Sequence, residues 1–478
     1  MINEVKSMEE LIALFENFTG KKVELTQELT SSGSNRRYYR LKSGSTSIIG
    51  VRGTSREENH AFITIARHFH SQGLNVPELY AVSEDEMTYI QEDLGESQLY
   101  QMVSKGRETG DYNESEIELL CKAVSKLPEI QFKGAEGLDF GVCYPDSEFN
   151  ERMVNFDLNY FKYCFLKATG LEFNEVRLQD DFDRLKEDLL KEQNNTFMYR
   201  DFQARNVMVR DREPYYIDFQ GGRRGPIYYD VASFIWQARS RFSEDLKETL
   251  IQAYLDSLRE FTEVNEVEFR EKLRIFVLFR TLQVLGAYGF RGYFEKKPHF
   301  LGSVPFALTS LRKLISKPFE KYPYLNEVLS SLTKLHHLYD VADDKRLEVR
   351  IYSFAYKRGV PLDNTGNGGG YVFDCRAINN PGKYEHFRQF TGLDKEVKDF
   401  LEDDGGVLKF LENVYSLVDS HVQRFQERKF THLQVCFGCT GGQHRSVYCA
   451  EHLAEHLSHK FDVKVALTHR ELHIEKQL

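Results

Sequence analysis

Two carboxylates and one carboxamide, set between short β-prone segments, constrain this chain more than any other feature of its sequence. Asp201 and Asn206 lie five positions apart, and Asp218 follows twelve positions later. Three segments around them are apolar and β-prone: 196–199, 206–210 and 215–217. Such segments, broken by the turn-forming run 211–214, predict short strands. We therefore expect Asp201 and Asn206 at the two ends of one tight loop, with Asp218 just after the returning strand.

Transfer of a phosphoryl group from a nucleotide needs this set of side chains. One carboxylate accepts the proton of the attacking hydroxyl, while a carboxamide and a second carboxylate hold the Mg²⁺ that neutralises the polyphosphate. A D-x-x-x-x-N pattern alone is common by chance, but the flanking strands and the I-D-F ending at 217–219 make this one far more specific. The cluster predicts phosphoryl transfer. A strand-turn-strand whose carboxylates have no chemical role is the alternative.

Composition sets outer limits on this prediction. A length of 478 residues favours two or three domains, and 41% hydrophobic residues suffice for packed cores. Because no uninterrupted apolar run reaches 18 residues and the chain starts without a signal-peptide pattern, we expect no membrane span. Seven scattered cysteines indicate reduced thiols and a cytoplasmic location. The net charge of −10 argues against a general binder of nucleic acid or anionic membranes.

The segment before residue 96 mixes strands with a helix. Its patterns predict strands at 23–29, 37–41, 46–51 and 87–92 and a helix at 57–72. The last strand runs into Asp93-Leu94-Gly95, which we expect to be a hinge. From residue 96 to about 335 the pattern is mostly helical, interrupted by the strands around Asp201.

A second domain is predicted after a polar linker. The helical pattern ends with a predicted helix at 330–338, the stretch 339–345 is polar, and a new strand starts at Leu347. The predicted domains are 1–340, with lobes at about 1–93 and 96–340, and 345–478. The acidic excess lies before Lys345, so the second domain is close to neutral. Its glycine-rich residues 366–370 are expected to form a flexible loop.

The first 340 residues resemble the aminoglycoside phosphotransferase family, and within it the anomeric amino-sugar kinases that phosphorylate N-acetylmuramate and N-acetylglucosamine. The stretches that carry the resemblance are Ser34–Leu41, Asn75–Pro77, Gln91–Gly95, Arg200–Val209, Ile217–Gln220 and Gly225–Asp230. The resemblance implies a bilobal, protein-kinase-like α+β fold. It also implies transfer of the γ-phosphate of ATP, with Mg²⁺, to a small hydroxylated substrate, with an amino sugar as the expected class.

The same resemblance assigns roles to the nucleotide-binding residues. Asp201 would be the catalytic base, and Asn206 and Asp218 the magnesium ligands. The adenine would lie against residues near Gln91, Glu92 and Leu94.

Two further acidic residues receive roles from the resemblance. Asp157 falls where related sugar kinases have an acidic residue near the substrate; an exposed helix residue is the alternative. Asp230 would cap or brace the substrate lobe rather than react.

Two features depart from the family pattern. Tyr199 stands where the family has histidine, which predicts weaker bonding within the loop. The third strand carries no lysine to pair with the nucleotide phosphates. Arg52 at its end could serve, as could Arg36 or Arg37, because arginine grips phosphate in a bidentate manner. The expected phosphate-covering loop is 31–34.

A second anion site is predicted near the C-terminus. The glycine-rich run 438–446 lies between a predicted strand, 431–437, and a predicted helix, 446–457. Backbone N–H groups at such a strand-helix turn bind anions such as phosphate. The side chains of His444 and Arg445 would add charge-assisted hydrogen bonds.

Cys439 and Arg445 also satisfy C-x5-R-S, the spacing of cysteine-dependent phosphatases, in which a thiolate attacks phosphorus. No aspartate loop for the general acid can be assigned. Two other patterns resemble zinc motifs: His452–His456 spells H-x-x-E-H, and Cys436 and Cys439 form C-x-x-C. An exposed helix face and an isolated pair explain them better.

Residues 347–478 resemble the C-terminal domain of the RNase adapter protein RapZ. The matching stretches are 353–354, 357–363, 372–376, 380–381, 391–397 and 438–446. In that family the domain binds glucosamine-6-phosphate and contributes to binding of small RNA and partner proteins. The resemblance implies that the phosphate is held by residues of the glycine-rich loop: Thr440, Gly441, Gly442, His444, Arg445 and Ser446. It implies that Asp374 and Arg376 face the sugar. Gly382 stands where the family usually has a histidine.

The sequence therefore predicts a two-domain, ATP- and Mg²⁺-dependent kinase that acts on an amino-sugar hydroxyl, fused to a domain that binds a phosphorylated amino sugar. Two alternatives stay open. One is an RNA- or protein-binding adapter with a vestigial kinase lobe, and the other is an aminoglycoside or choline kinase.

Overall fold

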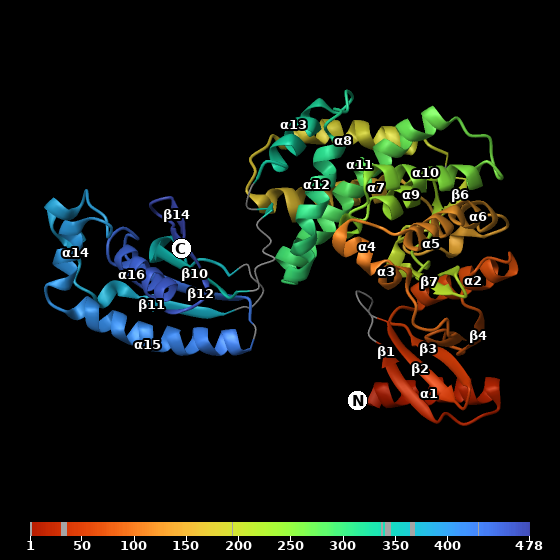
Figure 1. Cartoon of the computed structure of the whole chain (residues 1–478), viewed down its shortest axis with the longest axis horizontal. Coiled ribbons are helices and arrows are strands. Elements are labelled where there is room, and N and C mark those ends of the chain that lie inside the picture. Colours follow the sequence, from red (N-terminus) through yellow and green to blue (C-terminus); the bar gives the residue numbers. More distant parts are fainter. Residues whose placement is uncertain are drawn as a thin grey trace. The chain divides into compact units, whose positions relative to one another are not determined.

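The structure, a computed structural model, describes residues 2–29, 36–193, 195–335, 338–339, 346–363, 369–428 and 430–478. The chain divides into two compact units, Met1–Phe290 with Ser303–Tyr339, and Arg291–Gly302 with Asp340–Leu478 (Figure 1). The expected phosphate-covering loop, nearly all of the polar linker and most of the glycine-rich segment lie outside the described residues.

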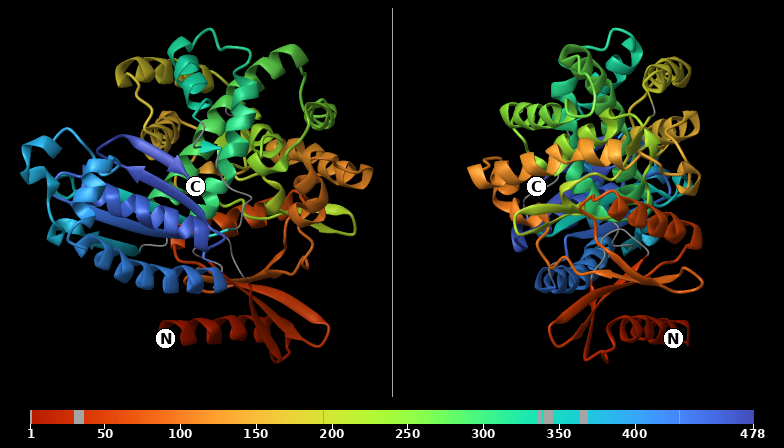
Figure 2. Two further views of the ribbon diagram at one scale, coloured as in Figure 1. Left: turned by 60° about the vertical axis from the view of Figure 1, so that its left-hand side comes forward. Right: turned by 90° about the vertical axis from the view of Figure 1, so that its right-hand side faces the viewer.

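The first unit begins with a five-stranded antiparallel sheet in the order β1-β2-β3-β5-β4. Its strands are β1 (Leu25–Leu29), β2 (Arg37–Ser43), β3 (Thr46–Arg52), β4 (Leu79–Val82) and β5 (Thr88–Glu92). Helix α1 (Ile2–Thr19) packs against this sheet and buries Leu11 and Phe15 in a core shared with Leu41 and Ile48 (Figure 2). The sequence did not predict α1 or β4, whereas the other four strands form within two residues of their expected bounds.

Helix α2 (Arg56–Ser71) joins the sheet to the catalytic strands. Its Phe62 stacks on Tyr89 of β5 with ring centroids 5.0 Å apart, and on Phe219 at 5.1 Å. Phe219 directly follows Asp218 in the chain. The aromatic stack therefore fixes the acidic cluster relative to α2.

The rest of the first unit is helical, as expected, with two short two-stranded antiparallel sheets. Its helices are α3 (Leu99–Met102), α4 (Ser104–Thr109), α5 (Glu114–Ser125), α6 (Leu127–Lys133), α7 (Glu151–Tyr160), α8 (Glu175–Leu190), α9 (Tyr228–Ile235), α10 (Glu244–Leu258), α11 (Glu266–Gly289), α12 (Val304–Leu314) and α13 (Pro323–Leu332). Strand β6 (Thr196–Met198) pairs with β9 (Arg223–Gly225), and β7 (Val207–Arg210) pairs with β8 (Glu213–Tyr216). The helix predicted at 330–338 is wrong: α13 ends at Leu332, where the chain turns.

Helix α11 with the π-turn after it spans Glu266–Phe294, the one helix of the described residues long and apolar enough to cross a membrane. In this fold 61% of its most apolar window is buried. Leu278 and Leu282 have no exposed surface, and the buried Arg280 donates a 3.2 Å hydrogen bond from Nε to Ser233 Oγ of α9. These contacts make α11 the core helix of the helical lobe.

The second unit is built on a five-stranded sheet in the order β11-β12-β10-β13-β14. Its strands are β10 (Glu348–Ala355), β11 (Gly370–Asp374), β12 (His432–Cys439), β13 (Lys464–His469) and β14 (Ile474–Gln477). The first four are parallel and β14 is antiparallel. Its helices are α14 (Lys395–Glu402), α15 (Gly406–Glu427) and α16 (Arg445–Lys460). The loop from β12 to α16 thus lies at the carboxyl edge of parallel strands, where ligands of such sheets bind.

One apolar core holds this second unit together. Helix α15 contributes an apolar stripe at helical spacing, consisting of Val407, Leu411, Val414, Val418 and Val422. The stripe packs with Leu453 and Leu457 of α16 and with the buried face of the sheet. The strand and the helix predicted around the anion loop are both confirmed, and α16 extends beyond its expected end to Lys460.

Candidate functional site

The loop between β6 and β7 carries Asp201 and Asn206. Asn206 Nδ2 donates a 2.8 Å hydrogen bond to the backbone carbonyl of Asp201, which ties the two ends of the loop together. The backbone N–H of Ile217 in turn donates to the Asn206 carbonyl at 3.1 Å. These bonds confirm the tight loop and the returning strand. Because the amide nitrogen of Asn206 is bonded within the loop, its Oδ1 atom is the one suited to a cation.

Asp218 needs a positive charge beside it. Burial raises the pKa of the Asp218 carboxyl, and the neighbouring Asp201 carboxylate raises it further. Gln220 Nε2 donates a 2.9 Å hydrogen bond to one of its oxygens. Mg²⁺ is bound through one or two carboxylates, with water and substrate phosphate as its other ligands. The oxygens of Asn206 and Asp218 fit such a cation, which would supply the missing charge.

Two residues of this site have a strained backbone. Arg200 and Asp218 both have left-handed φ angles, +74° and +70°, although neither is glycine. Such conformations cost free energy and persist where the surrounding structure holds them in place. Their position on either side of Asp201 is typical of a functional loop.

Asp230 of α9 provides that hold. Its two carboxylate oxygens accept hydrogen bonds from the backbone N–H groups of Tyr199 at 2.7 Å and Arg200 at 2.8 Å. Complete burial raises the pKa of Asp230 to about 7. The residue therefore braces the catalytic loop from behind.

Tyr199 strengthens the loop instead of weakening it. Its hydroxyl donates a hydrogen bond to the backbone carbonyl of Ile217, and its ring packs edge-on against Phe202 and Phe219. The prediction that a tyrosine here reduces the bonding of the loop is wrong, because the longer phenol reaches the returning strand.

Asp157 of α7 is buried beside the catalytic loop. Only 2% of its surface is exposed, so the alternative of an exposed helix residue is wrong. Burial raises its pKa to about 6, and Arg200 opposes this shift more than any other charge. Asp201 also acts on it. The fold thus brings the acidic residue of α7 within electrostatic range of Asp201.

The structure favours Arg36 over Arg52 as the phosphate-contacting arginine. Arg52 donates to Thr88 Oγ1 at 3.2 Å and pairs with Glu10 of α1 at 3.5 Å. Arg36 is buried and pairs with Glu58 of α2 at 3.2 Å. It is also among the charges that lower the pKa of Asp218. The position of Arg52 at the end of the third strand made it a candidate, but its side chain is bonded to Glu10 and Thr88 instead.

We expect Arg36→Ala to raise the KM for ATP by about tenfold or more, because a charge-assisted hydrogen bond to phosphate is worth about 1.5–3 kcal/mol. Arg52→Ala, the matched control from the same sheet, should change it by less than about twofold. Initial rates at varied ATP measure both values. A larger effect from Arg52→Ala would restore Arg52 to the site.

The hinge between the lobes is anchored by side chains. Asp93 accepts hydrogen bonds from Arg40 Nε at 2.7 Å and Ser47 Oγ at 2.5 Å. The carboxylate of Glu92 pairs with Arg210 of β7 at 2.5 Å, and its backbone N–H donates to the Glu78 carbonyl at 2.8 Å. Leu94 and Gln91 are buried. Gln91 Oε1 is a buried acceptor without a hydrogen-bond partner among the described residues, which suits contact with an adenine amino group.

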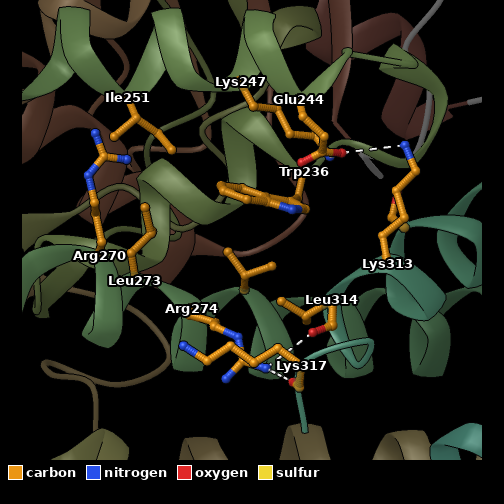
Figure 3. Close-up of a pocket in the computed structure, with 12 residues that line it drawn as sticks. Trp236, Glu244, Lys247, Ile251, Arg270, Leu273, Arg274, Lys313, Leu314 and Lys317 are labelled. Atoms are coloured by element: carbon orange, nitrogen blue, oxygen red, sulfur yellow. Dashed lines mark hydrogen bonds and ion pairs between the residues drawn. The ribbon is translucent and has the colours of Figure 1, made fainter. Parts of the chain in front are cut away.

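A separate pocket of about 310 Å³ lies in the helical lobe, between α10, α11 and α12 (Figure 3). Trp236 and several basic side chains line it. Two of those cations are already bonded: Lys313 pairs with Glu244 at 3.4 Å, and Arg274 donates to the Leu314 carbonyl at 3.2 Å. The pocket contains none of the acidic cluster and is not the catalytic site.

In the second unit the chain folds back over the end of β12. The backbone N–H of Gly442 donates to Cys439 Sγ at 3.1 Å, and this sulfur lies 3.2 Å from Ser446 Oγ. Gly442 has a left-handed φ of +71°, and a Cβ there would lie 2.9 Å from the Ala355 nitrogen and 2.5 Å from Glu471 Oε2. Only glycine fits this position. Glu471, buried against the loop, is a residue that no sequence pattern indicated.

The predicted anion ligands gather around this loop. Arg445 Nη1 donates to the carbonyls of Arg376 and Ile378 at 3.0 and 3.1 Å, and its Nη2 to Thr440 Oγ1 at 3.4 Å. Asp374 and Arg376 form an exposed salt bridge of 2.7 Å at the end of β11. His444 Nε2 is 3.0 Å from the Phe387 carbonyl. The residues expected to face phosphate and sugar are thus brought to one edge of the sheet.

The zinc-like patterns hold no metal cluster. Among the residues with described positions, no group of three or more His, Cys, Asp and Glu side chains is placed to bind a metal. His456 instead pairs with Asp419 at 2.9 Å and stacks on Tyr415. The phosphatase alternative at Cys439 stays a prediction; its sulfur is buried.

The fold and the site define a protein-kinase-like phosphotransferase joined to an α/β domain with an anion loop. Comparison with family models gives the same result: residues 26–266 match the phosphotransferase enzyme family, and residues 347–473 match the RapZ C-terminal domain. The first match covers half of the chain. The chain belongs to the phosphotransferase enzyme family and carries a RapZ C-terminal domain.

Individual relatives match only in part. A nucleotide-binding protein of Fervidobacterium nodosum is 37% identical over 142 residues, which are 30% of this chain and 48% of the relative. One of Xylella fastidiosa is 40% identical over 127 residues, 27% of this chain and 42% of the relative. The chain thus spans about half the length of the curated relatives it matches. A choline kinase structure from Cryptosporidium parvum is 12% identical, with a TM-score of 0.46 over 68% of this chain and 99% of that one.

Proposed function

We propose that this chain is an ATP- and Mg²⁺-dependent kinase of the cytoplasm that phosphorylates a hydroxyl of a small molecule, namely an amino sugar of the N-acetylmuramate or N-acetylglucosamine type. One observation carries the proposal. Asp201 stands at the end of a strained loop that Asp230 fixes from behind, and Asn206 and Asp218 face the same loop. These are the parts that phosphoryl transfer to a hydroxyl requires.

The residues divide the work between them. Asp201 holds the acceptor hydroxyl and accepts its proton as the phosphoryl group is transferred. Arg36 contacts the nucleotide phosphates, and Gln91 with the hinge backbone holds the adenine. Asn206 and Asp218 would hold Mg²⁺, which would offset the charge of the polyphosphate. Because Asp230 bonds the loop backbone, Asp201 is positioned before the substrates arrive.

A panel of acceptors tests this function. ADP release is measured with N-acetylmuramate, N-acetylglucosamine, choline and aminoglycosides, each with ATP and Mg²⁺. We expect turnover of an amino sugar that disappears when EDTA removes the cation. If only choline or an aminoglycoside is turned over, that compound and not an amino sugar is the substrate. No turnover of any acceptor would favour an adapter that binds RNA or protein.

We also propose that the anion loop of the second domain binds a phosphorylated amino sugar, such as glucosamine-6-phosphate. The gathering of Thr440, His444 and Arg445 around a glycine-rich turn at a helix N-terminus supports this. Binding of the product class by the same chain would let the domain sense the kinase reaction.

Gly441 offers a direct test of the anion loop. A side chain added at Gly441 meets no atom within 4 Å, so a substitution there need not disturb the fold. We expect Gly441→Asp to weaken glucosamine-6-phosphate binding by about tenfold or more, because it sets a carboxylate against the phosphate. Gly441→Asn, of equal size and neutral, is the control. Calorimetry on the full chain measures both, and equal affinities would rule out phosphate at this loop.

A further inference from the structure

The guanidinium group of Arg223 in β9 has little negative charge close to it. Only 1% of its surface is exposed. Its one ion pair, to Asp146, is long at 3.8 Å, and its other contacts are the Gly221 carbonyl at 3.2 Å and the Met153 sulfur at 3.7 Å. Burial lowers its pKa to about 10, with Arg200 the next cause. Two guanidinium groups therefore share one region of low dielectric.

Arg200 lies directly beside the catalytic base. The side chains of Arg200 and Asp201 flank Gly221: a Cβ built there would lie 3.9 Å from Arg200 Cδ and 3.9 Å from Asp201 Oδ2. Within the described residues no hydrogen bond or close ion pair reaches the half-buried Arg200 guanidinium; burial opposes its charge, but Tyr229 and the Asp201 carboxylate raise its pKa from a distance. Gly221 is also the residue that Arg223 contacts. Both arginine side chains thus lie next to Gly221, which is also near the Asp201 carboxylate.

Asp157 and Arg280 complete the group. Arg200, Arg280 and Arg223 all act on the Asp157 carboxyl. Asp157 Oδ2 is buried and has no hydrogen-bond partner among the described residues. A buried, unpartnered oxygen costs free energy unless a ligand supplies its donor. We refer to Arg200, Arg223 and Arg280 as the arginine cluster.

The carboxylates near the arginine cluster do not satisfy it. Asp230 is bonded to two backbone N–H groups, and Asp146 is shared between the 3.8 Å pair with Arg223 and a 3.5 Å pair with Arg152. Asp201 faces the acceptor hydroxyl in the proposed reaction. Arg200 is thus left without a directly bonded anion.

We propose that the arginine cluster binds an anionic group, a carboxylate or a phosphate, on the acceptor whose hydroxyl Asp201 deprotonates. This inference rests on the proposed kinase function. Guanidinium groups bind both anions through paired N–H groups, and the anion supplies the charge that the cluster lacks. Asp157 Oδ2 then accepts a hydrogen bond from a hydroxyl or amide of the same molecule. Cationic acceptors are disfavoured because they meet like charge.

Matched acceptors test the inference. N-acetylmuramate and N-acetylglucosamine differ by a lactyl carboxylate, and glucuronate and glucose differ by one carboxylate. We expect kcat/KM to be about tenfold or more higher for the anionic member. Arg200→Gln should remove this preference, because kcat/KM should fall about tenfold or more further for the anionic member than for the neutral one. Arg224→Gln is the control, because Arg224 lies beside Arg223 in β9 but is exposed, with its guanidinium over the Phe140 ring. This variant should preserve the preference for the anionic acceptor.

Two results would overturn the inference while the kinase function stands. One is an equal loss of kcat/KM for both members of a pair in Arg200→Gln. The other is preference of the wild-type enzyme for neutral or cationic acceptors. If no acceptor is turned over, the kinase proposal is contradicted. Calorimetric titration of the wild-type chain with both pairs of acceptors then tests anion binding by the arginine cluster separately. Binding of the anionic members without preference over the neutral ones, or no binding at all, then contradicts it.

Discussion

Asp201→Asn should lower kcat by about 10²–10⁴-fold while leaving the KM for ATP close to that of the wild type, because only proton transfer from the acceptor is removed. Asparagine has the same size but cannot accept the proton. The loop should keep its shape, since the bond from Asn206 Nδ2 goes to the backbone carbonyl of residue 201 and not to its side chain. ADP release with saturating acceptor measures the loss.

The control for this experiment is Asp211→Asn in the exposed turn between β7 and β8. It removes one carboxylate from the same lobe and should change neither kcat nor KM. Melting temperatures of both variants should match the wild type. If Asp201→Asn is as active as the wild type on the best acceptor, Asp201 is not the base and the vestigial-kinase alternative gains support.

Asp230→Ala should lower the free energy of unfolding by about 2–5 kcal/mol and abolish phosphoryl transfer, because it leaves two buried N–H groups without an acceptor. Those are the backbone N–H groups of Tyr199 and Arg200, the first residues of the catalytic loop. The strained backbone at Arg200 has no other observed brace of this kind among the described hydrogen bonds. Urea unfolding of the full chain, followed by initial rates below the transition, separates the two losses.

Asp230→Asn distinguishes bracing from charge. The carboxamide keeps one acceptor oxygen, so we expect stability between those of the wild type and Asp230→Ala, with partial activity. If Asp230→Asn and Asp230→Ala are equally stable and equally inactive, the role of Asp230 depends on its charge rather than on its two hydrogen bonds.

Local patterns carried most of the correct predictions. The strands around Asp201 and the strand-loop-helix at Gly438–Ser446 were predicted because each is formed by residues close in sequence. The two-residue turn at Asp211 and Arg212, with φ angles of +53° and +63°, was shorter than expected. Pro214 pairs with Val209 inside β8 instead of ending the turn.

Contacts between distant segments decided the rest. Arg36 pairs with Glu58 of α2, which lies 22 positions further along the chain, whereas sequence order alone favoured Arg52. The burial of Asp157 follows from the packing of α7 against α11. Arg223 becomes notable only because β9 pairs with β6 and so lies beside the catalytic loop.

The chemistry can be inferred from local spacing: Asp201, Asn206 and Asp218 at fixed spacing indicate phosphoryl transfer, and the glycine-rich loop near Gly442 indicates a bound anion. Spacing suffices for these sites because a tight loop or a strand-helix turn restricts where its side chains can lie. The charges that surround Asp201 depend instead on the folded chain, because residues far apart in sequence, such as Asp157, Arg223 and Arg280, are brought near one another by packing and burial. Those distant charges, rather than the local motif, point to the kind of acceptor that the enzyme takes.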